Sequence, residues 1–161
     1  MIKVICMNKS IRSLAKRLLG TVMKSKTVKY RGYTFKGSFQ DFGFLNSLAV
    51  DDREPLMADI FLKSISETSV VFDIGAHLGQ YSILAASKAK SNRSVFAFEI
   101  HSRTFDYLKQ NIHVNGFDEI IVPLYKAFSD SPGKISVNID MQQSDFTSIT
   151  QVRTGASLSK I

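Results

Sequence analysis

Cysteine is nearly absent from this 161-residue sequence, since Cys6 is the only one. A single cysteine excludes an intramolecular disulfide, and the chemistry of the chain is therefore that of an intracellular protein. We interpret the glycosylation sequons that begin at Asn8 and Asn92 as chance matches. Long apolar runs are missing too: none approaches the roughly 20 residues that a membrane-spanning helix needs. We expect a cytoplasmic protein.

Acidic residues are missing from the first 40 positions, which hold ten lysine and arginine residues. The net charge of the whole chain is +7, from 21 basic and 14 acidic residues. Residues 41–161 hold the other 11 basic residues and all 14 acidic ones, so they carry a net charge of −3. Charge thus divides the chain into a basic arm, residues 1–30, and a domain, residues 31–161.

The arm has the pattern of a basic amphipathic helix, with Arg12, Lys16 and Arg17 off its apolar stripe. These three charges interrupt what would be the apolar region of a secretory signal. The helix either docks on the domain or lies on an anionic membrane surface through residues 10–26. We expect no nucleic-acid partner, because the basic residues lack interleaved aromatic side chains and a recognisable motif. The stripe consists of Ile11, Leu14, Ala15, Leu18, Leu19, Val22 and Met23.

Two short elements are predicted between the arm and the centre of the chain. Aromatic residues spaced by two or four over residues 31–39 favour a strand or hairpin. Residues 50–65 favour a helix, with Asp51 or Asp52 as its cap, Pro55 in its first turn, and Leu56 and Ile60 on one face.

The central segment alternates between apolar strands and amphipathic helices. Residues 69–72, SVVF, are apolar on both faces, which is typical of an interior strand of a parallel sheet, and Asp73 closes this strand. A helix is predicted over residues 80–89, a strand over 94–99 and a helix over 102–115 that ends at Gly116. A third strand follows within residues 119–129. The order β-α-β-α-β is that of half a doubly wound sheet. Residues 134–140 favour one more strand, and the last twenty residues show little periodicity.

The turn GAHLG, residues 75–79, joins the first strand of this unit to the first helix. Glycines there let the backbone approach a ligand, and a helix N-terminus presents N–H groups. The turn lacks the G-x-G-x-x-G of a dinucleotide loop and the G-K-[ST] of a P-loop. Asp73 before it suits a cationic ammonium, and Glu99 at the end of the next strand suits a ribose diol. A ligand with an amino-acid end and a ribose fits both, and S-adenosylmethionine is such a ligand.

Three blocks in order resemble the S-adenosylmethionine-dependent class I methyltransferases of the FkbM type: VVFDIGAHLGQYSILAA, VFAFEIHSRTFDYLKQNIHVNG and IIVPLYKAFSDSPGKISV. The resemblance runs from Asp51 to about Asp140. It implies an α/β, Rossmann-like class I methyltransferase fold and O-methylation of a sugar or related metabolite. It also implies that Asp73, Gly75, Ala76, His77, Gly79, Gln80 and Tyr81 surround the methionine end of the cofactor, that Glu99 holds the ribose, and that Ala127 and Phe128 lie near the adenine.

The sequence departs from this family at three places. His77 stands where the family often has asparagine, and Ile100 stands where it often has proline. The family pattern also continues into further strands, which this sequence does not contain before Ile161, so we expect an incomplete sheet. The acceptor pocket and any general base would come from that missing region. We therefore assign no catalytic residue and no metal ligand, and interpret His77, His101 and His113 as structural.

Two functions remain open from the sequence. The chain is either a methyltransferase part, acting on a small-molecule or saccharide acceptor once a complementary chain completes it, or a non-catalytic module that keeps the nucleotide pocket and binds a membrane or a partner through its arm. In the class I order the third, second and first strands lie side by side, so the outer edge of the strand at residues 69–72 would be open. An open edge predicts self-association or pairing with a complementing chain.

Overall fold

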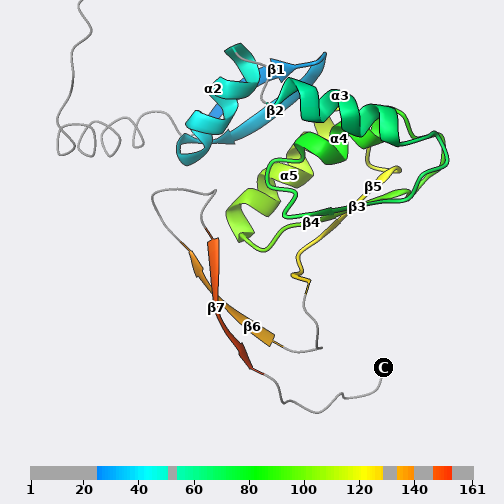
Figure 1. The fold of residues 1–161 in the computed structure, drawn as a ribbon. Helices are drawn as coiled ribbons and strands as arrows, with labels where there is room; N and C mark the ends of the chain where they lie inside the picture. The colour runs from blue at the N-terminus through cyan, green and yellow to red at the C-terminus, as the bar shows by residue number, and fades with distance from the viewer. Residues whose placement is uncertain (1–24, 51–53, 129–133, 140–146, 154–161) are drawn as a thin grey trace, which may run out of the picture.

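The computed structural model describes residues 25–50, 54–128, 134–139 and 147–153 (Figure 1). The predicted arm helix and the predicted caps Asp51 and Asp52 lie outside these residues. In chain order the elements are β1 (Ser25–Tyr30), β2 (Tyr33–Ser38), the short 3-10 helix η1 (Phe39–Asp41), α2 (Phe42–Val50), α3 (Pro55–Ser64), β3 (Val71–Ile74), α4 (Gln80–Ala86), β4 (Val95–Phe98), α5 (Ser102–Val114), β5 (Ile121–Leu124), β6 (Lys134–Ile139) and β7 (Thr147–Arg153).

A parallel sheet of three strands, in the order β3-β4-β5, forms the centre of the described chain. Its register pairs Asp73 with Ala97 and Ala97 with Pro123. With α4 and α5 as crossovers, this is the predicted β-α-β-α-β unit in the predicted strand order. The predicted α/β, Rossmann-like arrangement is therefore confirmed, with three strands of the parallel sheet among the described residues.

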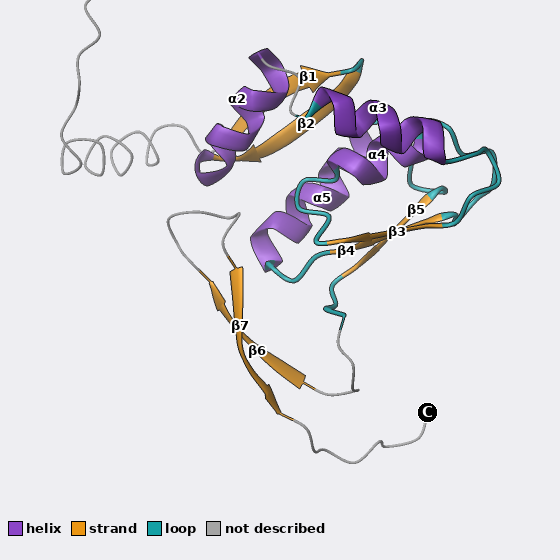
Figure 2. Ribbon diagram, viewed as in Figure 1, coloured by secondary structure: helices purple, strands orange, loops and turns teal. Residues whose placement is uncertain are grey.

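One face of this sheet is covered by helices (Figures 1 and 2). Both α4 and α5 pack on it, and α3 packs on α4. The side chains that the strands direct toward these helices, such as Val95, Ala97 and Ile121, are buried. They join Leu84 of α4 and Leu108 of α5 in one apolar core. Burial of this helix-facing surface supplies the main apolar stabilisation of the unit.

The other face of the sheet has no covering element among the described residues (Figure 1). Val70, Phe72 and Ile74 are 61%, 57% and 60% exposed. The Phe72 ring stacks on the rings of Phe96 and Phe98, with centroids 5.2 and 6.2 Å apart. The expectation that residues 69–72 are buried on both faces is wrong, because the helices that the structure describes cover one side of β3 and leave Val70 and Phe72 exposed. The strand also begins later than expected and continues past Asp73 to Ile74.

A second unit comprises the antiparallel hairpin β1–β2, η1 and α2. Residues 25–30, which the charge pattern places in the arm, form β1 of this hairpin. It docks on α5 through two asparagine amides. Asn111 binds the backbone N–H and C=O of Lys36, at 2.8 and 3.0 Å, and Asn115 binds those of Thr34, at 2.9 and 2.8 Å. The pattern over residues 31–39 predicted β2, but its partner β1 lies in the segment assigned to the arm, and α2 was missed.

Several boundaries differ from the sequence-based expectations. α3 begins at Pro55, but Leu56 and Ile60 are exposed, and only Ala58 of this helix is buried. α4 ends at Ala86 rather than at residue 89. β6 pairs antiparallel with β7, a strand that lies in the segment where no periodicity was found. Among the described helices, none combines the length and the apolar composition that crossing a membrane requires.

Candidate cofactor site

The loop between β3 and α4 is held against the end of β4 by its own backbone. Gly75 N–H and Ala76 N–H both donate to the carbonyl of Phe98, at 2.9 and 2.8 Å. Gly79 N–H donates to the carbonyl of Ala76 at 2.7 Å. These N–H groups are therefore engaged within the protein. The expectation that the loop offers unpaired N–H groups to a ligand is wrong for Gly75, Ala76 and Gly79, because these groups donate to backbone carbonyls of the protein.

Glu99, directly after β4, is buried and accepts three backbone hydrogen bonds. Its Oε1 accepts from the N–H groups of Ile100 and His101, at 2.8 and 2.7 Å. Its Oε2 accepts from the N–H of His77 at 2.9 Å. A carboxylate offers about four lone-pair positions, two on each oxygen. Oε2 thus retains capacity for one more donor, such as a ribose hydroxyl.

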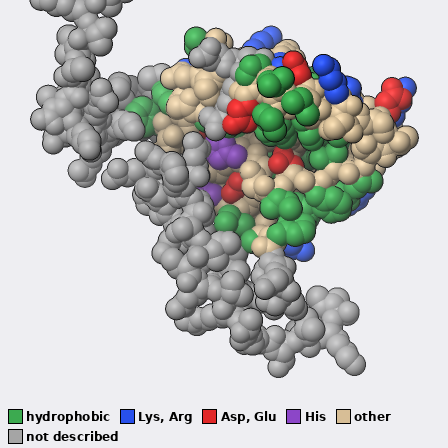
Figure 3. All heavy atoms as spheres, in the orientation of Figure 1, with side chains coloured by type: hydrophobic (Ala, Val, Ile, Leu, Met, Phe, Trp, Pro, Cys, Tyr) green, Lys and Arg blue, Asp and Glu red, His purple; other side chains and the backbone are tan. Residues whose placement is uncertain are grey.

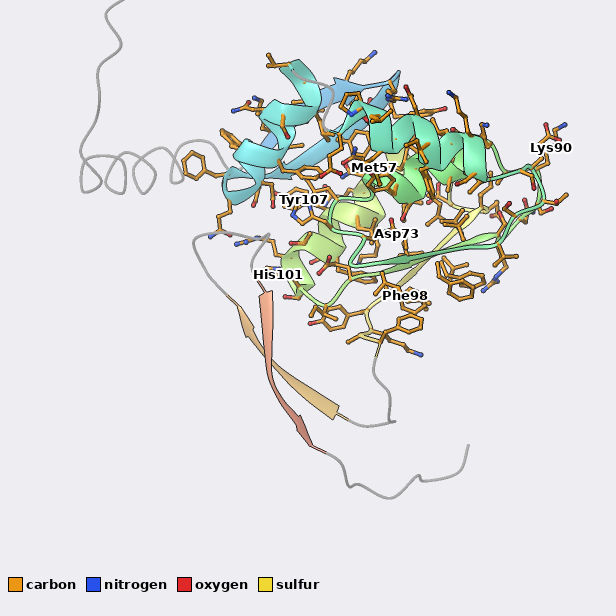
Figure 4. All side chains as sticks on the ribbon, viewed as in Figure 1. Met57, Asp73, Lys90, Phe98, His101 and Tyr107 are labelled. Atoms are coloured by element: carbon orange, nitrogen blue, oxygen red, sulfur yellow. The ribbon has the colours of Figure 1, made fainter. Side chains whose placement is uncertain are left out.

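Asp73 lies on the helix-covered side of β3, opposite to Phe98 on the bare side (Figure 4). Its Oδ2 accepts the hydroxyl of Ser82 in α4 at 2.5 Å. Burial raises the pKa of this carboxyl above its usual 3.8, the hydrogen bonds from Ser82 lower it, and the charge of Glu99 raises it. A nearby cation would offset the burial and favour the charged form. The structure therefore brings Asp73 and Glu99 to the same end of adjacent strands.

The two glycines of the loop serve different purposes. Gly75 has φ +80° and has open space where a Cβ would stand. A side chain there would be strained and would occupy that space. Gly79 has φ +91°, and a Cβ on it would lie 2.7 Å from Cδ1 of Leu108. Gly79 therefore permits close packing of the loop on α5, and Gly75 leaves open space beside the carboxyl end of β3.

His77 links this loop to the hairpin unit. Its Nε2 lies 3.4 Å from Oδ1 of Asp41, and its ring packs edge-on against Phe44, with centroids 4.7 Å apart. Asp41 is fully buried and accepts two hydrogen bonds from Ser38, from N–H at 2.7 Å and from the hydroxyl at 2.6 Å. His77 also has φ 51°, which is the left-handed region that favours glycine. The pairing with Asp41 and the hydrogen bond to Glu99 hold it there.

Gln80 and Tyr81, at the start of α4, contact other parts of the fold. The Gln80 amide donates to the hydroxyl of Tyr30 at 3.3 Å, and Gln80 is buried. The hydroxyl of Tyr81 donates to Oε2 of Glu54 at 3.1 Å, and its ring packs edge-on against Phe61. Both residues adjoin the loop. These contacts brace the loop, and the role of both residues at the cofactor stays a prediction.

The two residues expected near the adenine follow β5. Phe128 packs its ring edge-on against Phe98, with centroids 4.6 Å apart, and is half exposed. Ala127 precedes it and is partly buried. Phe128 thus belongs to the aromatic group on the bare face of the sheet, while Asp73 lies on the other face. Their role at the adenine stays a prediction.

Sequence reasoning missed Asp41 and Ser82 as parts of the site. A signal for Asp41 was available, since Ser38 and Asp41 form a capping box at η1, a pattern of spacing three that sequence shows. No sequence signal links Ser82 to Asp73 beyond its place in the first turn of α4. The remaining histidines lie where they were expected. His101 caps α5, and His113 lies on the surface of that helix with its Nδ1 3.2 Å from Asp118.

Comparison with known proteins gives this site a context. The family model for the TRM5/TYW2 methyltransferase domain matches residues 43–143. The hexuronic acid methyltransferase AglP of Haloferax volcanii is 32% identical over 77 residues, which are 48% of this chain and 30% of AglP. The uncharacterized protein MJ1452 of Methanocaldococcus jannaschii is 40% identical over 75 residues, 46% of this chain and 28% of that protein. The chain therefore spans less than a third of these relatives.

Solved structures share the fold. The tRNA m1G37 methyltransferase of M. jannaschii has a TM-score of 0.52 at 23% identity, over 70% of this chain and 33% of that one. A complex of aTrm5 with tRNALeu has a TM-score of 0.55 at 18% identity, over 80% of this chain and 44% of that one. The expectation of no nucleic-acid partner is wrong, because these relatives act on or bind tRNA. It rested on the arm alone, whereas the matched region is the domain that follows the arm.

Proposed function

We propose, from the premise that this chain belongs to the TRM5/TYW2 methyltransferase domain family, that its β3–β4–β5 unit holds S-adenosylmethionine for methyl transfer to a separate acceptor molecule. When bound, the sulfonium of this cofactor supplies the methyl group. The protein's part is to position donor and acceptor, since transfer is an in-line displacement. The intracellular chemistry of a chain with one cysteine supports action in the cytoplasm.

The observation that carries this proposal is the arrangement of Glu99. Three backbone N–H groups fix its carboxylate at the carboxyl end of β4, and Oε2 keeps acceptor capacity toward the loop. In open α/β sheets, ligands bind at the carboxyl ends of the strands. Glu99 is placed to accept the ribose hydroxyls, and the space beside Gly75 suits the methionine end. Asp73 would then hold the ammonium, whose charge would favour its ionised form.

For the acceptor we favour RNA, because the family model bears the name of Trm5 and the fold relatives include a complex of aTrm5 with tRNALeu. A saccharide of the FkbM type is the second candidate. The sequence match to a hexuronic acid methyltransferase, at 32% identity over 77 residues, supports it. The basic arm suits both RNA phosphates and an anionic membrane surface. We name no catalytic base.

Calorimetric titration with S-adenosylhomocysteine tests the cofactor part. Wild type should bind it in preference to NAD. Glu99→Gln keeps the shape of the side chain but halves its acceptors, and it should weaken binding about tenfold or more, since hydrogen bonds to a charged group contribute about 1.5–3 kcal/mol. Glu119→Gln, an exposed glutamate after α5, is the matched control. Equal binding by wild type and both variants would remove the proposed site.

Transfer of a labelled methyl group tests the acceptor. The chain is incubated with labelled S-adenosylmethionine and either total tRNA or a uronic-acid oligosaccharide. Label in tRNA supports the RNA acceptor, and label in the saccharide supports the second candidate. Label in neither, with cofactor binding intact, would support the non-catalytic module instead. Liposome binding with and without residues 1–24 then tests whether that module uses its arm on a membrane.

A further inference from the structure

The first turn of α5 holds a buried histidine with an unsatisfied donor. His101 is 4% exposed, and its Nδ1 accepts the backbone N–H of Thr104 at 3.3 Å. Burial, with the charge of Arg103 next, lowers the pKa of His101, so the ring is neutral near pH 7. A neutral ring that accepts at Nδ1 carries its proton on Nε2. This Nε2–H is buried and has no hydrogen-bond partner among the described residues.

Arg103, two residues further along the chain, also has buried N–H donors without a hydrogen-bond partner among the described residues, and its side chain is charged. Its Nε and Nη2 are buried and likewise lack a partner in the part of the chain that the structure describes. These two N–H groups form the side edge of the guanidinium, where the donors point in parallel and match the two oxygens of a carboxylate or phosphate. The hydroxyl of Thr104 is a third buried group without a described partner. Buried donors of this kind call for an acceptor.

The carboxylates nearby do not meet this need. Glu99 accepts from three backbone N–H groups and Asp41 from Ser38. Neither carboxylate accepts a hydrogen bond from Nε2 of His101 or from Nε and Nη2 of Arg103. Histidine and acidic side chains lie together at a hollow of the visible face (Figure 3). Figure 4 shows His101 at the start of α5, at the carboxyl end of the sheet where the cofactor site lies. The N-terminus of a 13-residue helix adds a partial positive charge there.

We propose that Arg103 and His101 hold an oxyanion of the methyl acceptor, with Nε–H and Nη2–H of Arg103 on two of its oxygens and Nε2–H of His101 beside them. This inference rests on the proposed function and names the chemistry of its acceptor. A phosphate of RNA and the carboxylate of a hexuronic acid both supply such an oxyanion. Neutral sugars and neutral bases do not. Arg103 is therefore a residue that selects the acceptor, separate from the ribose site at Glu99.

The test is an NMR titration of the full chain, saturated with S-adenosylhomocysteine, with the His101 ring signals as the readout. The probes are glucuronate, inorganic phosphate and glucose. Glucuronate or phosphate should shift the His101 signals, and glucose should not. Arg103→Gln should lower the affinity for the anion that shifts these signals at least tenfold, since a charge-assisted pair is lost. Arg103→Lys keeps the charge without the fork and should weaken it less. Lys109→Gln, an exposed cation of the same helix, is the matched control.

Each outcome decides the proposal. A shift by glucuronate alone supports a carboxylate acceptor, and a shift by phosphate alone or by both supports a site that accepts phosphate. No shift by either anion overturns the proposal, as does an equal loss in Lys109→Gln. Anion binding that S-adenosylhomocysteine displaces would also overturn it, because the donors would then serve the cofactor's own carboxylate. Failure to bind S-adenosylhomocysteine would refute the proposed function, while the anion titration without cofactor would still test Arg103.

Discussion

The two faces of the three-stranded sheet differ sharply although the same strands build both. On the covered face, Ala97 is fully buried under α4 and α5. On the bare face, Phe72 and Ile74 of the adjacent strand remain more than half exposed. Soluble domains rarely expose large contiguous apolar surface unless something binds it. Among the described residues, helices therefore cover one side of the α/β layer arrangement, and the apolar side chains of β3 on the opposite side stay exposed.

The comparison also separates stability from function. Charged and polar groups of the candidate site gather on the covered side and at the carboxyl ends of the strands, where helices and loops position them. The described side chains of the bare face that the structure leaves exposed on β3 are apolar, with Phe72 and Ile74 among them. Substitutions on the covered side should therefore change the free energy of unfolding and cofactor binding, while those on the bare face should change association.

The largest effect is expected from Leu108→Ala on the covered face. Leu108 is fully buried in α5 and lies close to Gly79, so its truncation leaves a cavity. We expect a loss of about 3 kcal/mol in the free energy of unfolding. Urea denaturation followed by circular dichroism measures it. Val114→Ala, at an exposed position of the same helix, should change stability by less than about 0.5 kcal/mol. Similar losses for both would contradict the assignment of the core to this face.

The next effect concerns the polar part of the covered side. Asn111→Ala removes three hydrogen bonds, two to Lys36 and one to the carbonyl of Leu78 at 3.0 Å, and leaves those backbone groups without partners. We expect a loss of about 2 kcal/mol. Gln110→Ala, one residue earlier and exposed, is the control. Thermal unfolding would refute the prediction if the two variants melted together.

A smaller effect of opposite sign is expected from Asp73→Asn. Because the folded-state pKa of Asp73 is raised, its contribution to stability is fully present below pH 3.8 and is lost as pH rises through the folded-state pKa. At pH 7 the ionised carboxylate therefore costs stability, and asparagine should raise the free energy of unfolding by about 0.5–1 kcal/mol. The gain should shrink as pH falls toward 4, and cofactor binding should weaken. A gain independent of pH would mean that ionisation is not the cause.

The smallest effect on folding is expected from Phe72→Lys on the bare face. An exposed side chain is replaced, so the free energy of unfolding should change by no more than about 0.5 kcal/mol. Self-association should decrease, because a lysine beside the outer edge of β3 discourages pairing with another chain. Light scattering across a concentration series measures this. Leu56→Lys, at an exposed site of α3, should leave association unchanged. A wild-type chain that stays monomeric at high concentration would refute the open-edge prediction.

The strand and helix order of the central unit could be predicted from sequence because each element carries its own pattern. α5 shows a helical period and ends at Gly116, which has φ +73°. Burial could not be predicted for β3, because its apolar residues look alike whether or not a second helix layer is present. α2 was missed because its apolar residues are not confined to one face. β7 was missed because its polar sequence shows no alternation.

The site could be predicted in part for a similar reason. Asp73 and Glu99 each follow from a position at the end of a strand, and the structure brings them to one edge. The contacts of His77 with Asp41 depend on how the hairpin unit docks, which no local pattern encodes. The donors of His101 and Arg103 stand out only when burial is known. The positions of the carboxylates could be predicted from the local sequence, whereas the contacts that distant segments supply could not.

The two asparagines of α5 have a geometric consequence for the hairpin. Positions four apart on a helix are separated by about 6 Å along its axis, and positions two apart on a strand by about 6.6–6.8 Å. The spacing of Asn111 and Asn115 along α5 thus agrees with the spacing of Lys36 and Thr34 along β2. The helix therefore binds alternate backbone groups of the strand, as a neighbouring strand would. A shift of β2 by one residue would present side chains to the wrong face and lose both pairs. The same register places Asp41 beside His77. The two asparagines of α5 therefore also determine how the cofactor loop is aligned with the hairpin unit.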